Sequence, residues 1–153
     1  MKYILPFILL IAACSQPAPV ARIAQTPSGY PEAVFSGISA QKLANKIAAR
    51  CVERGHIVLN NSPTQVKCDQ KLEQRDIVGA NAYAFIKSGK AVRDIHVYAQ
   101  YSLTKINGDI RVQSRTWKQF EMPYGRIEKL TLNDPERFNH VTQLLYSMGG
   151  KPV

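Results

Sequence analysis

The sequence predicts a single α+β domain in which an antiparallel sheet with a long β-hairpin is packed by an N-terminal and a C-terminal helix. Three patterns predict it. Apolar residues recur with a helical period after residue 38 and again after Pro135, and apolar and polar residues alternate on both sides of Asn107-Gly108. Residues 37–150 suffice for one hydrophobic core and are too few for two.

The first helix is expected to begin after Ser39, whose hydroxyl can accept a hydrogen bond from a free backbone amide, and to end at Gly55. Leu43, Ile47 and Cys51 recur at a spacing of four residues and form an apolar stripe. This stripe is expected to face the sheet.

Two short strands are expected next, over residues 56–68, with an Asn-Ser-Pro turn between them. Residues 70–79 are polar and indicate no element. Tyr83, Phe85 and their neighbours indicate a further strand.

The strongest signal surrounds Asn107-Gly108, the preferred pair for a type I′ turn between two strands. If Ile106 faces Asp109 across this turn, the register of the whole hairpin follows, because side chains alternate between the two faces. The core face then pairs Leu103 with Val112, Tyr101 with Ser114, Ala99 with Thr116 and Ile95 with Phe120. The outer face pairs Thr104 with Arg111, Ser102 with Gln113, Gln100 with Arg115, Tyr98 with Trp117 and His96 with Gln119.

A strand through Ile127, Leu130 and Leu132 and a last helix complete the predicted domain. Asp134 is expected to cap this helix, with Pro135 at its first position. Its buried stripe consists of Phe138, Val141, Leu145 and Met148, and Gly149-Gly150 ends it.

Near the start of the chain, Lys2 precedes an apolar run over residues 4–13. This run is too short to span a bilayer, which takes about 20 apolar residues. A positive start, a short apolar core and small residues before a cut are typical of a secretory signal. Residues 1–13 are therefore predicted to be a signal peptide.

The end of this run, Ile11-Ala12-Ala13-Cys14, resembles the lipobox of bacterial lipoproteins. The resemblance implies that the chain is cut before Cys14, that this cysteine carries diacylglycerol, and that the new amino terminus is acylated, for example with palmitate. Ser15 in place of an aspartate resembles lipoproteins exported to the outer membrane, so the domain is expected to face the periplasm from a lipid anchor there. An ordinary signal peptide with a cysteine near its end is the alternative.

Residues 14–36 are predicted to be the lipidated cysteine and a proline-rich tether, because this composition offers little apolar surface to bury. Fully extended, it would hold the domain about 60 Å from the membrane. In the alternative, the segment packs along the domain through Tyr30, Val34 and Phe35. Residues 151–153 are predicted to be a tail.

Cys51 and Cys68 are predicted to form a disulfide, because the lipobox places the domain in an oxidising compartment and their spacing fits no zinc or redox motif. The bond would join the first helix to the second short strand.

No catalytic constellation is visible in the sequence. His56, His96 and His140 lack ligand spacing, and the facing carboxylates of Asp94 and Glu121 lie at the open end of the hairpin. We expect no enzyme activity, no metal site, no cofactor and no small-molecule substrate.

Two surfaces are candidate binding sites. Lys42, Lys46, Arg50 and Arg54 form a basic row on the first helix, in a chain of formal net charge +9. Such a row can rest on anionic lipid or on lipopolysaccharide phosphates, or it is simply a solvated helix face.

The second surface is the outer hairpin face, with Tyr98, Trp117, Arg111 and Arg115. Tyrosine, tryptophan and arginine dominate the hot spots of protein interfaces. The alternative is an aromatic cross-strand pair that stabilises the hairpin by about 0.2 to 1 kcal/mol.

Together these features predict a non-enzymatic lipoprotein that docks on an envelope protein. The layout loosely resembles the small accessory lipoproteins of outer-membrane assembly and secretion machines, with no shared motif beyond the lipobox. The alternative is a binding module for anionic lipid, lipopolysaccharide or peptidoglycan. The export signal argues against nucleic acid as a partner.

Overall fold

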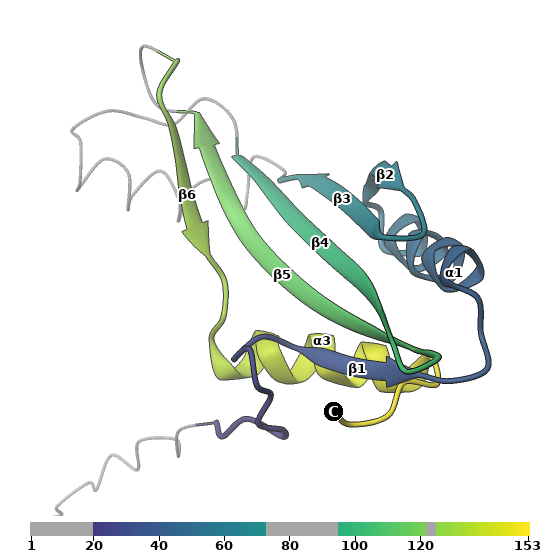
Figure 1. Ribbon diagram of the computed structural model, residues 1–153. Helices are drawn as coiled ribbons and strands as arrows, with labels where there is room; N and C mark the ends of the chain where they lie inside the picture. The colour runs from purple at the N-terminus through teal and green to yellow at the C-terminus, as the bar shows by residue number, and fades with distance from the viewer. Residues whose placement is uncertain (1–19, 73–94, 122–124) are drawn as a thin grey trace, which may run out of the picture.

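The computed structural model describes residues 20–72, 95–121 and 125–153 (Figure 1). Its elements, in chain order, are β1 (Glu32–Phe35), α1 (Ala40–Glu53), β2 (Ile57–Asn61), β3 (Gln65–Lys71), β4 (Ile95–Ile106), β5 (Asp109–Glu121), β6 (Ile127–Thr131) and α3 (Pro135–Ser147). Within these described residues, a six-stranded antiparallel sheet and two helices confirm the predicted α+β class.

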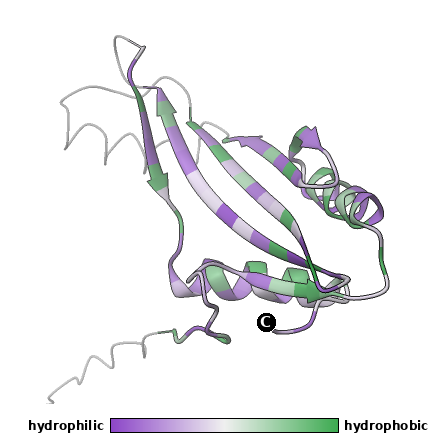
Figure 2. Ribbon diagram, in the orientation of Figure 1, coloured by the Kyte–Doolittle hydropathy of each residue, from purple (hydrophilic) through white to green (hydrophobic). Residues whose placement is uncertain are grey.

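The long hairpin β4–β5 is the centre of the sheet. Asn107 and Gly108 have φ angles of 50° and 92°, the positive values that a type I′ turn requires. Ile106 faces Asp109, and every pair predicted along both strands is observed. Buried residues alternate with more exposed ones along β4 and β5, and Figure 2 shows bands of differing hydropathy along both strands. The turn chemistry therefore sets which side chains share a face.

The strands follow the order β1-β5-β4-β3-β2, and β6 pairs with β5 as well. Strand β1 pairs with residues 110–113 of β5, whereas β6 pairs with residues 117–121. The two short strands thus lie one after the other along the same edge of β5 (Figure 1).

Helix α1 follows its predicted pattern. The Ser39 side chain accepts a hydrogen bond from the backbone nitrogen of Lys42 at 3.3 Å, which caps the helix. Leu43, Ile47 and Cys51 are buried in the core. The predicted stripe is confirmed.

Helix α3 is also confirmed. Asp134 caps it by accepting from the backbone nitrogen of Arg137 at 2.9 Å, and Pro135 stands in its first turn. The predicted stripe of Phe138, Val141, Leu145 and Met148 is buried. Side chains from both helices pack in one core cluster against the inner face of the sheet.

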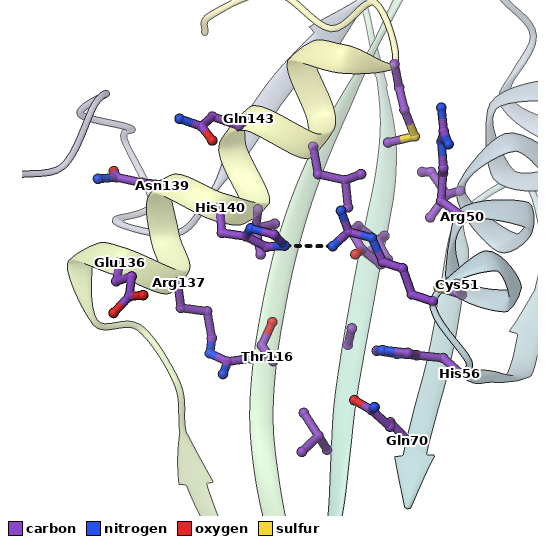
Figure 3. Close-up of a pocket in the computed structure, with 18 of the residues that line it drawn as sticks. Arg50, Cys51, His56, Gln70, Thr116, Glu136, Arg137, Asn139, His140 and Gln143 are labelled. Carbon is purple, nitrogen blue, oxygen red and sulfur yellow. Dashed lines mark hydrogen bonds between the residues drawn. The ribbon is translucent and has the colours of Figure 1, made fainter. Parts of the chain in front are cut away.

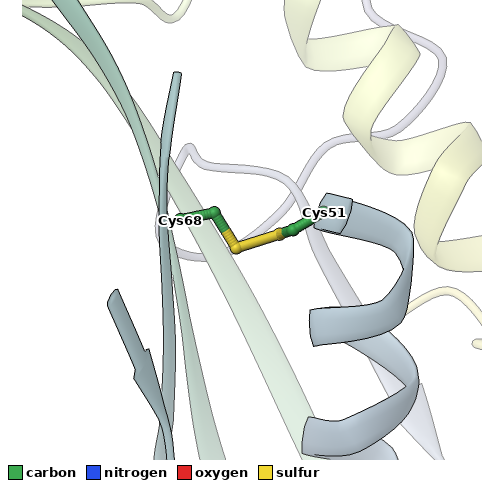
Figure 4. The surroundings of a disulfide bond; sticks show 2 residues. All are labelled: Cys51 and Cys68. Carbon is green, nitrogen blue, oxygen red and sulfur yellow. A yellow bond between two sulfur atoms is a disulfide. The ribbon is translucent and has the colours of Figure 1, made fainter. Parts of the chain in front are cut away.

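The disulfide between Cys51 and Cys68 is confirmed, with a Cα–Cα distance of 6.3 Å (Figure 4). It joins the last turn of α1 to β3. Both cysteines are buried, so the bond lies inside the core.

The predicted boundary between tether and domain is wrong at its C-terminal side. Residues 32–35, expected in the tether, form β1, and Ala33 and Phe35 are buried. The open edge of β5 offers unpaired backbone groups, and a short segment rich in small and apolar residues satisfies them. The alternative in which this segment packs on the domain is the one observed.

The segment before β1 also contacts the domain. Arg22 donates to the carbonyl of Asn133 at 3.0 Å, and the Ile23 backbone nitrogen donates to Asn139 at 2.7 Å. Cys14 lies only six residues before Val20, which is the first residue that the structure describes. This stretch spans at most about 20 Å, far less than the distance predicted for the whole segment.

The predicted tail is part of the fold as well. Val34 and Lys151 exchange two backbone hydrogen bonds, both 2.9 Å long. Cys14, the predicted strand at Tyr83 and Phe85, and Asp94 lie outside the described residues.

Candidate functional site

An aromatic stack lies on the outer face of the hairpin. The rings of Tyr98 and Trp117 are 5.4 Å apart between centroids and inclined by 27°. The ring of His96 also stacks on that of Tyr98, with 5.9 Å between centroids. The cross-strand register brings these side chains together, since Tyr98 and Trp117 are direct partners. Both residues are partly buried, and Nε1 of Trp117 is buried with no hydrogen-bond partner among the described residues.

Two lysines from neighbouring strands flank this stack. The Lys67 ammonium lies 4.7 Å from the centroid of the Tyr98 ring, and that of Lys129 lies 5.9 Å from the Trp117 ring. They come from β3 and β6. The result is a cationic and aromatic surface, which we call the outer-face stack: His96, Tyr98, Trp117, Lys67 and Lys129.

Asp69 sits beside this stack. Its carboxylate lies 2.8 Å from Nδ1 of His96 and is largely shielded from solvent. Partial burial, together with the charge of Asp69, raises the pKa of the Tyr98 phenol. Tyr98 therefore stays protonated at neutral pH and keeps a hydroxyl donor at the surface.

The two predicted arginines of this face are held by the N-terminal segment. Arg111 donates to the Glu32 carboxylate at 2.5 Å, and the Arg115 guanidinium stacks over the Tyr30 ring at 4.8 Å. Glu32 is fully buried and also accepts from Gln113 at 3.1 Å. Arg111 thus fastens β1 to β5, and it belongs to the fold more than to a binding surface.

Burial alone would raise the pKa of the Glu32 carboxyl, but hydrogen bonds from Ser28, Arg111 and Gln113 and the charge of Arg111 outweigh it and lower the pKa. A lowered folded-state pKa means that the ionised group stabilises the fold at neutral pH. That contribution should disappear as the pH falls below the usual value of 4.5.

Glu32→Gln should therefore lower the free energy of unfolding by about 1 to 3 kcal/mol at pH 7, because it leaves the Arg111 guanidinium without its carboxylate. The loss should shrink in urea titrations below pH 4.5, where the wild-type carboxyl becomes protonated. Glu53→Gln is the matched control. Its exposed pair with Arg50 is worth at most about 1 kcal/mol. Equal effects of both substitutions would contradict the role assigned to Glu32.

The basic row of α1 turns toward α3. Lys46 donates to the carbonyl of Met148 at 2.8 Å, and Arg54 lies 2.7 Å from Nε2 of His140. Arg50 pairs with Glu53, and Lys42 is exposed. The predicted row exists, but most of it borders the space between the helices and does not form an open helix face.

That space is a cleft of about 800 Å³ between α1 and α3 (Figure 3). Its floor is the inner face of the sheet, with Val97, Ala99 and Tyr101 of β4. Polar side chains line its walls, among them Arg50, Arg54, His56, Gln70, Arg137, Asn139, His140 and Gln143. We call it the interhelical cleft.

More arginines than acidic residues line the cleft. Within the described residues, the guanidinium groups of Arg54 and Arg137 have no carboxylate partner within salt-bridge distance. A guanidinium can only donate, so Nε2 of His140 is the acceptor in its contact with Arg54. Burial, and then the charge of Arg54, lower the pKa of His56. The His56 ring is therefore uncharged at neutral pH.

Sequence reasoning did not find this cleft. Arg137, His140 and Asn139 lie on the exposed face of α3, where helical periodicity indicates only solvent. Their position opposite Arg54 depends on where two helices, distant in sequence, settle on the sheet. Lys67, Asp69 and Lys129 were missed beside the aromatic stack because no short turn sets the pairing of β3 and β6 with the hairpin.

Within the described ranges, no group of histidine, cysteine and acidic residues is arranged to hold a metal ion. None of the helices in these ranges is long and apolar enough to cross a membrane. Comparisons with protein-family models, with curated proteins and with solved structures find no match, so both surfaces are interpreted on their own chemistry.

Proposed function

We propose that the protein is a lipoprotein of the bacterial outer membrane whose periplasmic domain is a non-enzymatic docking module for an envelope protein. The lipobox at Cys14 supports the anchor. The buried bond between Cys51 and Cys68 supports an oxidising compartment, where disulfides persist.

The outer-face stack is the observation that carries the docking role. Both described helices pack against the inner face of the sheet, so no described helix covers Tyr98 and Trp117 on the other face. Partly exposed aromatic rings on a mostly polar sheet face are typical of interface anchors.

The flanking lysines indicate the chemistry of the partner. Lys67 and Lys129 bring two positive charges over the rings of the aromatic pair. An acidic surface would complement this arrangement, and complementary charges mainly set the rate and specificity of association. The proposed partner is therefore an envelope protein with an acidic docking surface.

A charge reversal tests this proposal. Lys67→Glu with Lys129→Glu should abolish the complex, because both ammonium groups would become like charges facing the acidic partner. Lys42→Glu with Lys105→Glu is the matched control, since it changes the net charge equally at exposed positions away from the stack. The measurement is photocrosslinking in intact cells from a probe at position 115, beside the stack.

The expected result is one discrete protein adduct that is retained in the control and lost in the outer-face variant. Adducts of equal yield in both variants would contradict the docking role. An adduct with lipid or glycan alone would favour the alternative, a module for lipopolysaccharide or peptidoglycan.

A further inference from the structure

The interhelical cleft combines an apolar floor with two guanidinium groups, those of Arg54 and Arg137, that have no carboxylate partner among the described residues. Val97 and Ala99 lie on its floor, and Leu144 lies on the α3 side. Arg54 approaches from α1 and Arg137 from α3. Such a cleft can hold a ligand that has both an apolar chain and an anionic head group, because the floor suits the chain and the arginines suit the head group.

We propose that the interhelical cleft binds one single-chain amphiphile with an anionic head, a carboxylate or a phosphate. Arg54 and Arg137 hold the head, and the acyl chain lies along the apolar floor. Guanidinium groups suit this role because their planar N–H groups match both oxyanions. The cleft volume of about 800 Å³ lies within the range typical of small-ligand sites.

Two histidines extend the polar end of the site. Nδ1 of His56 is buried and has no hydrogen-bond partner among the described residues. A buried polar atom without a partner is costly, and a ligand oxygen or a water held by the ligand would relieve that cost. His140 keeps Arg54 directed across the cleft through their 2.7 Å contact.

Two acids, Asp134 and Glu136, also line the cleft. The Asp134 carboxylate already accepts a hydrogen bond from the backbone nitrogen of Arg137 as the cap of α3, and Arg50 already pairs with Glu53. Arg54 and Arg137 are therefore the two cleft arginines without a carboxylate partner among the described residues, and they are the groups that an anionic head would contact.

The N-terminal segment brings the site close to a source of such ligands. Val20 lines the cleft, and Cys14 stands six residues before it. With a lipid on Cys14, the mouth of the cleft lies within about 20 Å of the bilayer surface. This reach depends on the lipid anchor proposed above, whereas the charge and volume of the cleft do not.

Equilibrium binding to the mature chain, residues 14–153, tests the proposal. The chain carries Cys14→Ser, so that no acyl chain of its own competes, and the probes are palmitate, butyl phosphate, dodecyl phosphate and inorganic phosphate. Dodecyl phosphate should bind at least about 100-fold more tightly than butyl phosphate, because each buried methylene adds to affinity. Inorganic phosphate should bind weakest.

Variants locate the head group. Arg54→Gln and Arg137→Gln should each weaken palmitate and dodecyl phosphate about 10-fold, the effect of one lost hydrogen bond to a charged group. Arg126→Gln is the matched control, because Arg126 is exposed next to β6 and is not among the residues that line the cleft. Far-UV circular dichroism confirms that each variant is folded.

Three results would overturn the proposal. Inorganic phosphate binding as tightly as dodecyl phosphate would make the site a simple anion site. An equal loss in Arg126→Gln would place the ligand elsewhere. Failure of the naturally lipidated protein to take up palmitate that the Cys14→Ser variant binds would make the protein's own acyl chain the occupant. None of these results bears on docking through the outer-face stack, so the two proposals fail separately.

Discussion

Cys14→Ser should abolish stable membrane binding of the mature protein. Each buried methylene of an acyl chain contributes about 0.8 kcal/mol, and several chains on one cysteine give an anchor that does not dissociate on the time scale of an experiment. Without them, the domain has only its surface cations, worth about 1 kcal/mol each near an anionic bilayer. Flotation of the purified protein with vesicles measures the difference.

The control and the contradictory outcome are simple. Ser15→Ala leaves the cysteine in place and should keep both the acyl mass and the flotation. An intact mass that shows no added lipid on the wild-type protein would remove the anchor. The proposed periplasmic localisation, and the proposed closeness of the cleft to the membrane through the segment between Cys14 and Val20, would then lose their support. The description of the fold would be unaffected.

Reduction of the bond between Cys51 and Cys68 should lower the free energy of unfolding by about 3 kcal/mol. The bond closes a loop with a sequence separation of 17 residues, and the chain-entropy model gives about this value for a loop of such length. A domain of this size is stable by about 5 to 15 kcal/mol, so the loss is a large fraction. Urea titrations with and without reductant measure it.

This comparison isolates the cross-link, because the reduced thiols keep the volume of the buried cystine. The variant Cys51→Ala with Cys68→Ala is the control, and its stability should not respond to reductant. It should be less stable than the reduced wild type, since it also leaves cavities at two buried positions. Equal stability of the oxidised and reduced wild type would contradict a stabilising disulfide.

The sequence determined the local parts of this fold. Asn107-Gly108 specifies the turn, and the period of two then assigns every side chain from Ile95 to Phe120 to a face. Caps and apolar stripes placed both helices almost to the residue, because these signals depend on neighbours within one or two turns. The disulfide followed from the compartment that the lipobox implies and from the lack of any other partner cysteine.

The tertiary structure alone decided which distant segments meet. No local signal says that residues 32–35 complete the edge of β5 or that Lys151 pairs with Val34, because backbone groups at a sheet edge accept any suitable strand. The interhelical cleft likewise exists only after α1 and α3 settle on the sheet. In the sequence, its arginines look like solvated surface residues. Only their position on opposite sides of a shared apolar floor makes them a candidate site for an anionic ligand.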